Sequence, residues 1–217
     1  MENSNEVLDE RQQQLVKISA FTSKSDVENL RIVLNEALDA GLTINEINEV
    51  LAHLYAYVGF PPSIRGIHLF KEVVEERKAK GLKDETGREA TLVSNKFSCY
   101  ERGERAQMIV TGLTAEQLTT LFAFNTLMDV FLKEHLFADI FDRDILTYIE
   151  RELVTVTSLA SVHDPFVRSH IGGALNVGVN ENQLRELFSI IESNVGKKEA
   201  DTATKVLDEV LATRQNN

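Results

Sequence analysis

The feature that most constrains this chain is an internal repeat. Residues 37–59 read ALDAGLTINEINEVLAHLYAYVG and residues 174–196 read ALNVGVNENQLRELFSIIESNVG, with identical residues at seven of 23 aligned positions. The similarity continues upstream, where QLVKISAFTS at 14–23 aligns with ELVTVTSLAS at 152–161. Two such copies present the same apolar faces, so packing these faces against each other would bury both.

Both copies contain the same signals for ending one helix and starting the next. Gly41 and Gly178 each come at the end of an apolar helical pattern, and glycine readily takes the left-handed conformation that closes a helix. A capping-box pair then starts the next helix in each copy: Thr43 with Glu46, and Asn180 with Gln183.

Apolar residues recur at three- and four-residue spacing along almost the whole chain, without the alternation typical of strands. The sequence therefore predicts an all-α protein, built as a tandem duplicated helical repeat that forms a pseudo-dimer within one chain. We expect a first repeat over 7–80, a polar and partly extended connector over 81–113, and a second repeat over 114–213. The segment 114–154 is predicted to be helical, and its many phenylalanines favour a core, a subunit interface or the apolar wall of a ligand pocket.

Composition narrows the class of function. The net charge of −11 and the pI near 5.0 would repel a nucleic-acid backbone. No apolar run approaches the ~18 residues of a membrane span, and the polar start of the chain lacks the pattern of a secretory signal. We therefore expect a cytoplasmic protein without a nucleic-acid or membrane partner. The single cysteine, Cys99, excludes an internal disulfide and a CxxC motif, and we interpret it as having no role.

The stretch RELVTVTSLASVHDPFVRSHIGGALNVG, residues 151–178, contains the first candidates for chemistry. Glu152 shares a helix face with Val156, Leu159 and Ala160. A carboxylate there lies either in an apolar pocket or at the solvated start of a helix beside Arg151. The pattern alone leaves both interpretations open.

The HDP sequence at 163–165 should separate two helices, because a residue before proline avoids the helical region. Its aspartate is a natural N-cap for a second helix over 165–177. Folding at this bend could bring Glu152 and His170 together, and a carboxylate that orients an imidazole is a common acid–base unit. The alternative is a core histidine with an ordinary hydrogen-bond partner. His163 lies at the bend, and no HxxxH or HExxH spacing indicates a metal site.

The two copies carry different polar residues at matching places. The first copy has Gln14 and Val33 in place of the glutamate and the histidine of the second copy. It has instead His53 and Tyr57, four residues apart on one helix face, which the second copy lacks. Divergence after duplication would explain the difference, but the complementarity also predicts one composite site per chain.

The sequences RELVTVTSLASV, RSHIGGALNVGV and ALDAGLTINEINEVLAHLYAYVGFPPSIRG resemble the carboxymuconolactone decarboxylase family, which also contains alkylhydroperoxidase-type reductases. The resemblance implies an all-helical homo-oligomer, with a trimer of tandem repeats favoured and sites at repeat interfaces. Its peroxide-reducing branch uses a glutamate, a CxxC pair and a histidine. Glu152 and His170 look like the glutamate and the histidine, but His163 and Phe166 occupy the cysteine positions. The resemblance thus favours the decarboxylase branch, which acts on a lactone acid without a cofactor.

The leading hypothesis is a cofactor-free enzyme for a small carboxylated or lactone substrate. His170 would transfer the proton, Glu152 would adjust the proton affinity of His170, and Arg168 would hold a carboxylate of the substrate. The catalytic candidates are Glu152, His170 and His163, and the substrate-binding candidates are His53, Tyr57 and Arg168. Two alternatives stay open, a non-catalytic helical oligomer or small-ligand-binding protein and, less favoured, a peroxide-detoxifying relative.

Overall fold

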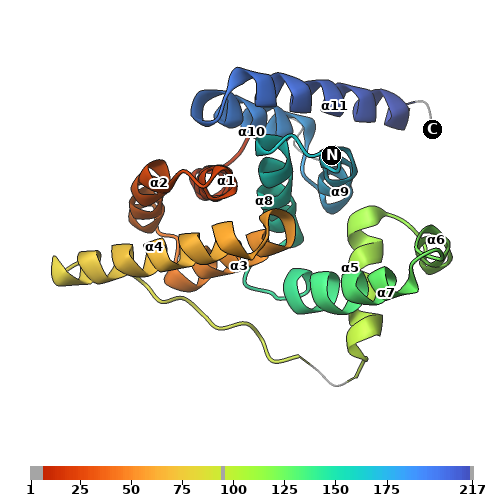
Figure 1. Ribbon diagram of the computed structural model, residues 1–217, viewed down its shortest axis with the longest axis horizontal. Helices are drawn as coiled ribbons and strands as arrows, with labels where there is room; N and C mark the ends of the chain where they lie inside the picture. The colour runs from red at the N-terminus through yellow and green to blue at the C-terminus, as the bar shows by residue number, and fades with distance from the viewer. Residues whose placement is uncertain (1–6, 94–95, 216–217) are drawn as a thin grey trace.

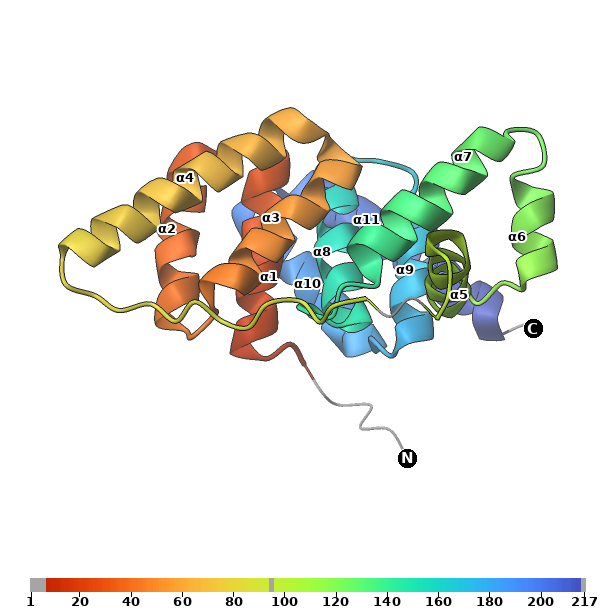
Figure 2. The same ribbon diagram turned by 90° about the horizontal axis from the view of Figure 1, so that it is seen from below.

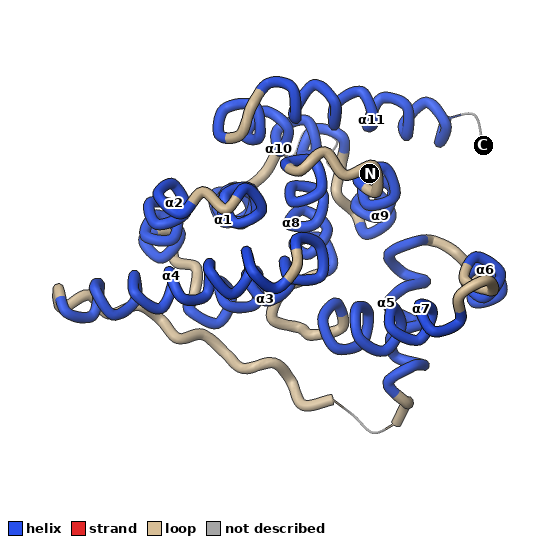
Figure 3. The backbone as a smooth tube through the Cα atoms, viewed as in Figure 1, coloured by secondary structure: helices blue, strands red, loops and turns tan. Residues whose placement is uncertain are grey.

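The computed structural model describes residues 7–93 and 96–215. Every regular element within these residues is a helix, so the predicted all-α class is confirmed (Figure 3). None of the described helices is both long and apolar enough to cross a membrane.

Two sets of four helices follow the same order along the chain. The first set consists of α1 (Glu10–Lys24), α2 (Val27–Asp39), α3 (Ile44–Val58) and α4 (Phe60–Ala79). The second set consists of α8 (Tyr148–Ser161), α9 (Val167–Val177), α10 (Glu181–Asn194) and α11 (Lys197–Gln215). Both predicted capping boxes are present, at the starts of α3 and α10. This arrangement fits the predicted duplication of a helical unit.

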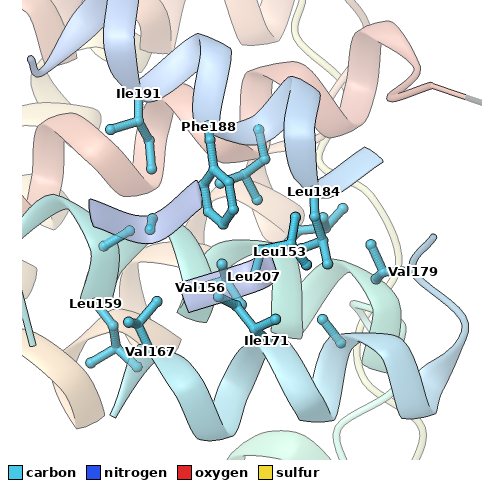
Figure 4. Close-up of a cluster of buried hydrophobic side chains, with 14 of the residues drawn as sticks. Leu153, Val156, Leu159, Val167, Ile171, Val179, Leu184, Phe188, Ile191 and Leu207 are labelled. Carbon is cyan, nitrogen blue, oxygen red and sulfur yellow. The ribbon is translucent and has the colours of Figure 1, made fainter. Parts of the chain in front are cut away.

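Each set has its own apolar core, and Figure 4 shows the core of the second set. Helices α1 and α8 pack against each other between the two cores (Figure 1). Val16 of α1 is buried in the core of the second set, and Val154 of α8 is buried in the core of the first. These two valines occupy the same position in the aligned segments QLVKISAFTS and ELVTVTSLAS. Such reciprocal insertion is the pattern of a two-fold interface, which makes the halves mutually dependent.

The segment predicted as a connector contains a helix. Residues 82–93 are extended and hydrogen-bond to the start of α3, where Ile44 N–H donates to the Glu85 carbonyl at 2.9 Å. Helix α5 (Cys99–Thr111) follows, with Ser98 and Glu101 forming its capping box. The predicted extended character therefore holds only for the first part of the segment. The interpretation missed α5 because its sequence, CYERGERAQMIVT, has a short apolar stripe interrupted by glycine.

The segment 114–154, predicted to be helical, is divided into several elements. It contains α6 (Ala115–Leu121), α7 (Thr126–Val130), the π-helix η1 (Phe131–Phe141) and the first part of α8. Asn125 caps α7, and a capping box between Thr147 and Glu150 starts α8 after a non-helical stretch. Helices α5, α6 and α7 and the π-helix η1 form one end of the molecule (Figure 2). An eleven-residue π-helix is unusual, and short π segments often occur at functional sites.

The bend between α8 and α9 lies where it was predicted, but α9 begins later than residue 165. His163 takes the left-handed conformation, with φ of 57°. The Asp164 side chain accepts a hydrogen bond from the Phe166 N–H at 2.8 Å, so it caps a turn rather than the helix itself. Helix α9 therefore starts at Val167.

Gly103 allows α5 to cross η1 at very short range. A Cβ built on Gly103 would lie 1.6 Å from the backbone oxygen of Lys133. We expect Gly103→Ala to lower the free energy of unfolding by about 1–3 kcal/mol or more, because backbone atoms must move apart. Gly172→Ala is the matched control, since Gly172 is also helical but its nearest atom lies 4.0 Å away. It should stabilise by about 0.5–1 kcal/mol. Equal effects of both changes in urea unfolding would contradict this account.

Candidate active site

Glu152 and His170 meet across the bend between α8 and α9. His170 Nδ1 lies 3.2 Å from Oε1 and 3.1 Å from Oε2 of Glu152. The Glu152 side chain is fully buried, whereas the His170 side chain is 16% exposed. The predicted pairing is therefore present in the structure. The solvated interpretation of Glu152 does not fit, because the neighbouring Arg151 forms its ion pair with Glu49 instead.

Gly173, three residues after His170, lets α9 approach the Glu152 carboxylate closely. A Cβ on Gly173 would lie 3.2 Å from Glu152 Oε2 and 3.2 Å from Val110 Cγ1, tighter than an ordinary contact. The absence of a side chain at this position thus leaves room for the carboxylate between two helices.

The pairing fixes the proton on one nitrogen of the imidazole. A carboxylate only accepts hydrogen bonds, so Nδ1 of His170 donates to Glu152. In the neutral ring, Nε2 then keeps its lone pair, and among the described residues no group hydrogen-bonds to it. A ring held in this way can accept a proton at Nε2, or donate one there once it is protonated.

His53 and Tyr57 of α3 adjoin this pair, which brings residues of both repeats together. The Tyr57 ring packs edge-on against His170, with 5.3 Å between ring centroids, and it packs at a tilt of 40° against His53 at 5.2 Å. The Tyr57 hydroxyl oxygen is buried and has no partner with hydrogen-bonding geometry among the described residues. Burial raises the pKa of Tyr57 and the Glu152 carboxylate raises it further, while the nearby Thr155 hydroxyl opposes the shift. Tyr57 is therefore a neutral phenol that can donate to a ligand.

A buried polar network lies behind Tyr57. Arg151 Nη2 donates to Glu49 Oε1 at 2.7 Å, and Arg151 Nη1 donates to His53 Nδ1 at 3.3 Å. The guanidinium can only donate, so the neutral His53 ring carries its proton on Nε2. Nε2 then donates to Thr155 Oγ1 at 2.8 Å. The network fixes the ring of His53 and holds it against Tyr57.

A cavity of about 530 Å³ adjoins Tyr57 and His170. Its walls are mainly apolar. One wall comes from α5, α6 and their flanks, with Val110, Leu113, Leu118, Leu121 and Phe122. The π-helix contributes a second wall with Leu132, Leu136 and Phe137. The polar lining residues are Tyr57, Gln107, Thr111, Asp164, Ser169 and His170. A mostly apolar cleft with a few convergent polar groups is typical of a small-molecule site.

Two predicted site residues lie elsewhere. His163 does not line this cavity, and its Nε2 lies 3.4 Å from Glu199 Oε1 at the start of α11. Arg168 points outward on α9 and pairs with Glu209 of α11. Neither side chain is brought to the Glu152–His170 pair. His53 is also set back from the cavity, because Tyr57 stands between it and His170.

The structure adds residues that sequence reasoning did not select. Gln107 of α5 lines the cavity, is 2% exposed, and its Oε1 has no hydrogen-bond partner among the described residues. Arg151 and Glu49 form the buried ion pair of the network. The only signal for Arg151 was its place beside Glu152 on a helix that is otherwise apolar. No pattern in the sequence distinguished Gln107.

The described residues contain no group of three or more His, Cys, Asp and Glu side chains arranged to hold a metal ion. Cys99 lies at the first turn of α5, where its Sγ donates to the Glu134 carbonyl at 3.3 Å, and it does not line the cavity. Burial and the Asp139 carboxylate raise the pKa of the Cys99 thiol. A raised pKa lowers the thiolate fraction and therefore the reactivity of the sulfur.

Stability should depend on pH through His53. Burial, then the charges of Arg151 and His170, hold the pKa of His53 well below the ordinary value of 6.5. The unfolded chain takes up a proton near pH 6.5 that the folded chain does not, so stability falls as the pH drops below this value. The slope is at most about 1.4 kcal/mol per pH unit.

His53→Gln removes this contribution, so the stability gap between the original protein and the variant should narrow from pH 7.5 to pH 5.5. Urea unfolding of both proteins at the two pH values measures the gap. A gap that stays constant would mean that His53 is not the neutral buried group described here.

The family model described as carboxymuconolactone decarboxylase family matches residues 1–72 and 128–209, which is well over half of the chain. The two matched segments contain the two sets of four helices except for the ends of α4 and α11. No curated protein matches the sequence.

Proposed function

The chain belongs to the carboxymuconolactone decarboxylase family, and we propose that it is a cofactor-free lyase for a small lactone or carboxylated substrate. The observation that carries this proposal is the buried Glu152 carboxylate, 3.1 Å from Nδ1 of a histidine whose ring lines the cavity. Proton transfer by a positioned imidazole is worth roughly 100- to 10,000-fold in rate.

When the carboxylate is attached to the carbon next to a carbonyl group, each polar side chain of the site has a defined role in decarboxylation. The C–C bond to the carboxylate breaks, carbon dioxide leaves, and the electron pair moves into the carbonyl to form an enolate. The neutral Tyr57 phenol donates a hydrogen bond to the enolate oxygen. Protonated His170 delivers the Nε2 proton to the carbon, while the Glu152 carboxylate stabilises the imidazolium. A proton from water restores His170.

Disulfide-based peroxide reduction is not proposed. It needs two thiols beside the glutamate and histidine, but the chain has one cysteine. The Cys99 thiol lies on the side of α5 that faces the Glu134 carbonyl of η1, away from the cavity lining.

The mainly apolar walls of the cavity support a second candidate, a small-ligand-binding protein without catalysis. Both candidates predict ligand binding, but only the first predicts turnover. The discriminating experiment measures carbon dioxide release from carboxymuconolactone and from a panel of related lactones and β-keto acids. Release above the uncatalysed rate supports the lyase. Binding of panel members without any release would favour the second candidate and contradict the first.

We further propose that the chain forms a homo-oligomer, with a trimer favoured by the family resemblance. Phe124, Leu127 and Phe131 of the α6–α7–η1 region are exposed apolar side chains that an interface would cover. Light scattering coupled to size-exclusion chromatography tests the proposal. A monomer at micromolar concentration would contradict it.

A further inference from the structure

The residues that line the cavity come from two different parts of the chain. Tyr57 and His170 lie within the segments that match the family model, residues 1–72 and 128–209. Helices α5 and α6, which form one wall, lie in the unmatched segment between them. The residues proposed for the chemistry therefore lie in segments that match the family model, whereas this wall lies outside them.

The charge of the lining argues against a substrate with several carboxylates. Among the residues that the structure describes, no lysine or arginine lines the cavity. Asp164 adds a carboxylate to the lining, and the buried Glu152 lies just behind His170. Arg168, the candidate for holding a carboxylate, pairs with Glu209 instead. Protonated His170 is thus the one lining side chain able to balance a negative charge, and an unpaired second carboxylate in an apolar site is costly.

Gln107 marks where an uncharged polar group of a ligand would bind. Its side chain is almost completely buried on α5, and its Oε1 lacks a partner among the described residues. Buried polar atoms are nearly always hydrogen-bonded, so an unpaired amide lining a cavity points to a missing partner. No hydrogen bond among the described residues fixes the orientation of this amide, so by rotating it can present Nε2 to a carbonyl oxygen or Oε1 to a hydroxyl group.

We propose that the substrate is a mainly apolar carbonyl compound with at most one carboxylate, bound by Gln107 at an uncharged oxygen and selected by the α5–α6 wall. The inference that this substrate carries a reacting carbonyl group rests on the function proposed above. The volume of about 530 Å³ falls in the range of roughly 300–1,000 Å³ usual for ligand sites. It leaves room for an apolar body beyond the reacting carbonyl.

Three nine-carbon probes that do not react test this choice by isothermal titration calorimetry with the full chain. They are γ-nonalactone without charge, nonanoate with one carboxylate and nonanedioate with two. The first two should bind, and nonanedioate should bind about tenfold more weakly than nonanoate or worse. Equal binding of nonanoate and nonanedioate would overturn the proposal, as would a failure of all three to bind.

Two variants of the wall provide the matched comparison. Leu121→Arg places a cation in the lining at a position that is already 63% exposed, so folding should tolerate it. It should remove or reverse the preference against nonanedioate. Ile109→Arg is the control, because Ile109 of α5 is 52% exposed but does not line the cavity. The same change in relative affinity for nonanedioate in both variants would mean that the net charge of the protein, and not the charge of the cavity lining, decides binding.

Gln107→Leu keeps the approximate shape of the side chain and removes its polar groups. It should weaken γ-nonalactone by about threefold to tenfold, the range for one hydrogen bond, without loss of thermal stability. Unchanged lactone affinity would overturn the role of Gln107. None of these measurements requires turnover. The binding results can therefore contradict the proposed substrate class even if carbon dioxide release supports the lyase, and they can support the substrate class even if no carbon dioxide is released.

Discussion

Glu152→Gln is expected to lower turnover by about 100- to 10,000-fold while the fold stays intact. Glutamine has nearly the same shape but carries no charge, so it cannot stabilise the imidazolium of His170. The measurement is carbon dioxide release from the best panel substrate, with urea unfolding to confirm the fold. The variant should stay folded, because the glutamine Oε1 can still accept the hydrogen bond from His170 Nδ1.

The control for this variant is Glu192→Gln on α10. The Glu192 side chain is 50% exposed and, among the residues that the structure describes, forms its one ion pair with Lys197 at the start of α11. Its loss should leave turnover unchanged. Unchanged turnover in the Glu152 variant would remove Glu152 from the proposed mechanism.

Arg151→Met should be the most destabilising change in the buried network. The Arg151 side chain is fully buried between Glu49 and His53, and its removal leaves the inward side of the Glu49 carboxylate without a partner. Breaking a buried ion pair from one side costs about 3–5 kcal/mol of unfolding free energy. Urea unfolding measures the loss.

Arg143→Met is the matched control, because Arg143 binds the same Glu49 carboxylate from the solvent side with 45% of its side chain exposed. An exposed ion pair contributes at most about 1 kcal/mol. Similar losses in the two variants would mean that burial does not set the strength of this network.

The duplicated helical fold could be predicted because its signals are local. Glycine closures, capping boxes and apolar spacing recur in both copies, and each acts within a few residues. The Glu152–His170 contact could also be predicted, since one bend joins the two helices and sets their relative heights. The contribution of α3 followed from complementary polar residues, and the structure brings Tyr57 to His170.

Other features depend on packing that no local pattern records. One of the two open interpretations made Arg151 a solvated neighbour of Glu152, but α3 places Glu49 and His53 against Arg151. Gln107 lies in a segment whose polar composition resembled a connector, and only its packing onto η1 and α9 gives it a place in the cavity. Arg168 lies two residues from His170 on α9 and therefore on another face of the helix, where it pairs with Glu209.

The central claim is that Glu152 and His170 act as one acid–base unit. A double-mutant cycle tests it most directly, with kcat/KM measured for Glu152→Gln, His170→Asn and the combined variant. Residues that act as a unit show strongly non-additive losses. We expect the combined variant to be about as slow as the slower single variant. Losses that multiply would contradict the claim, because the two residues would then act independently.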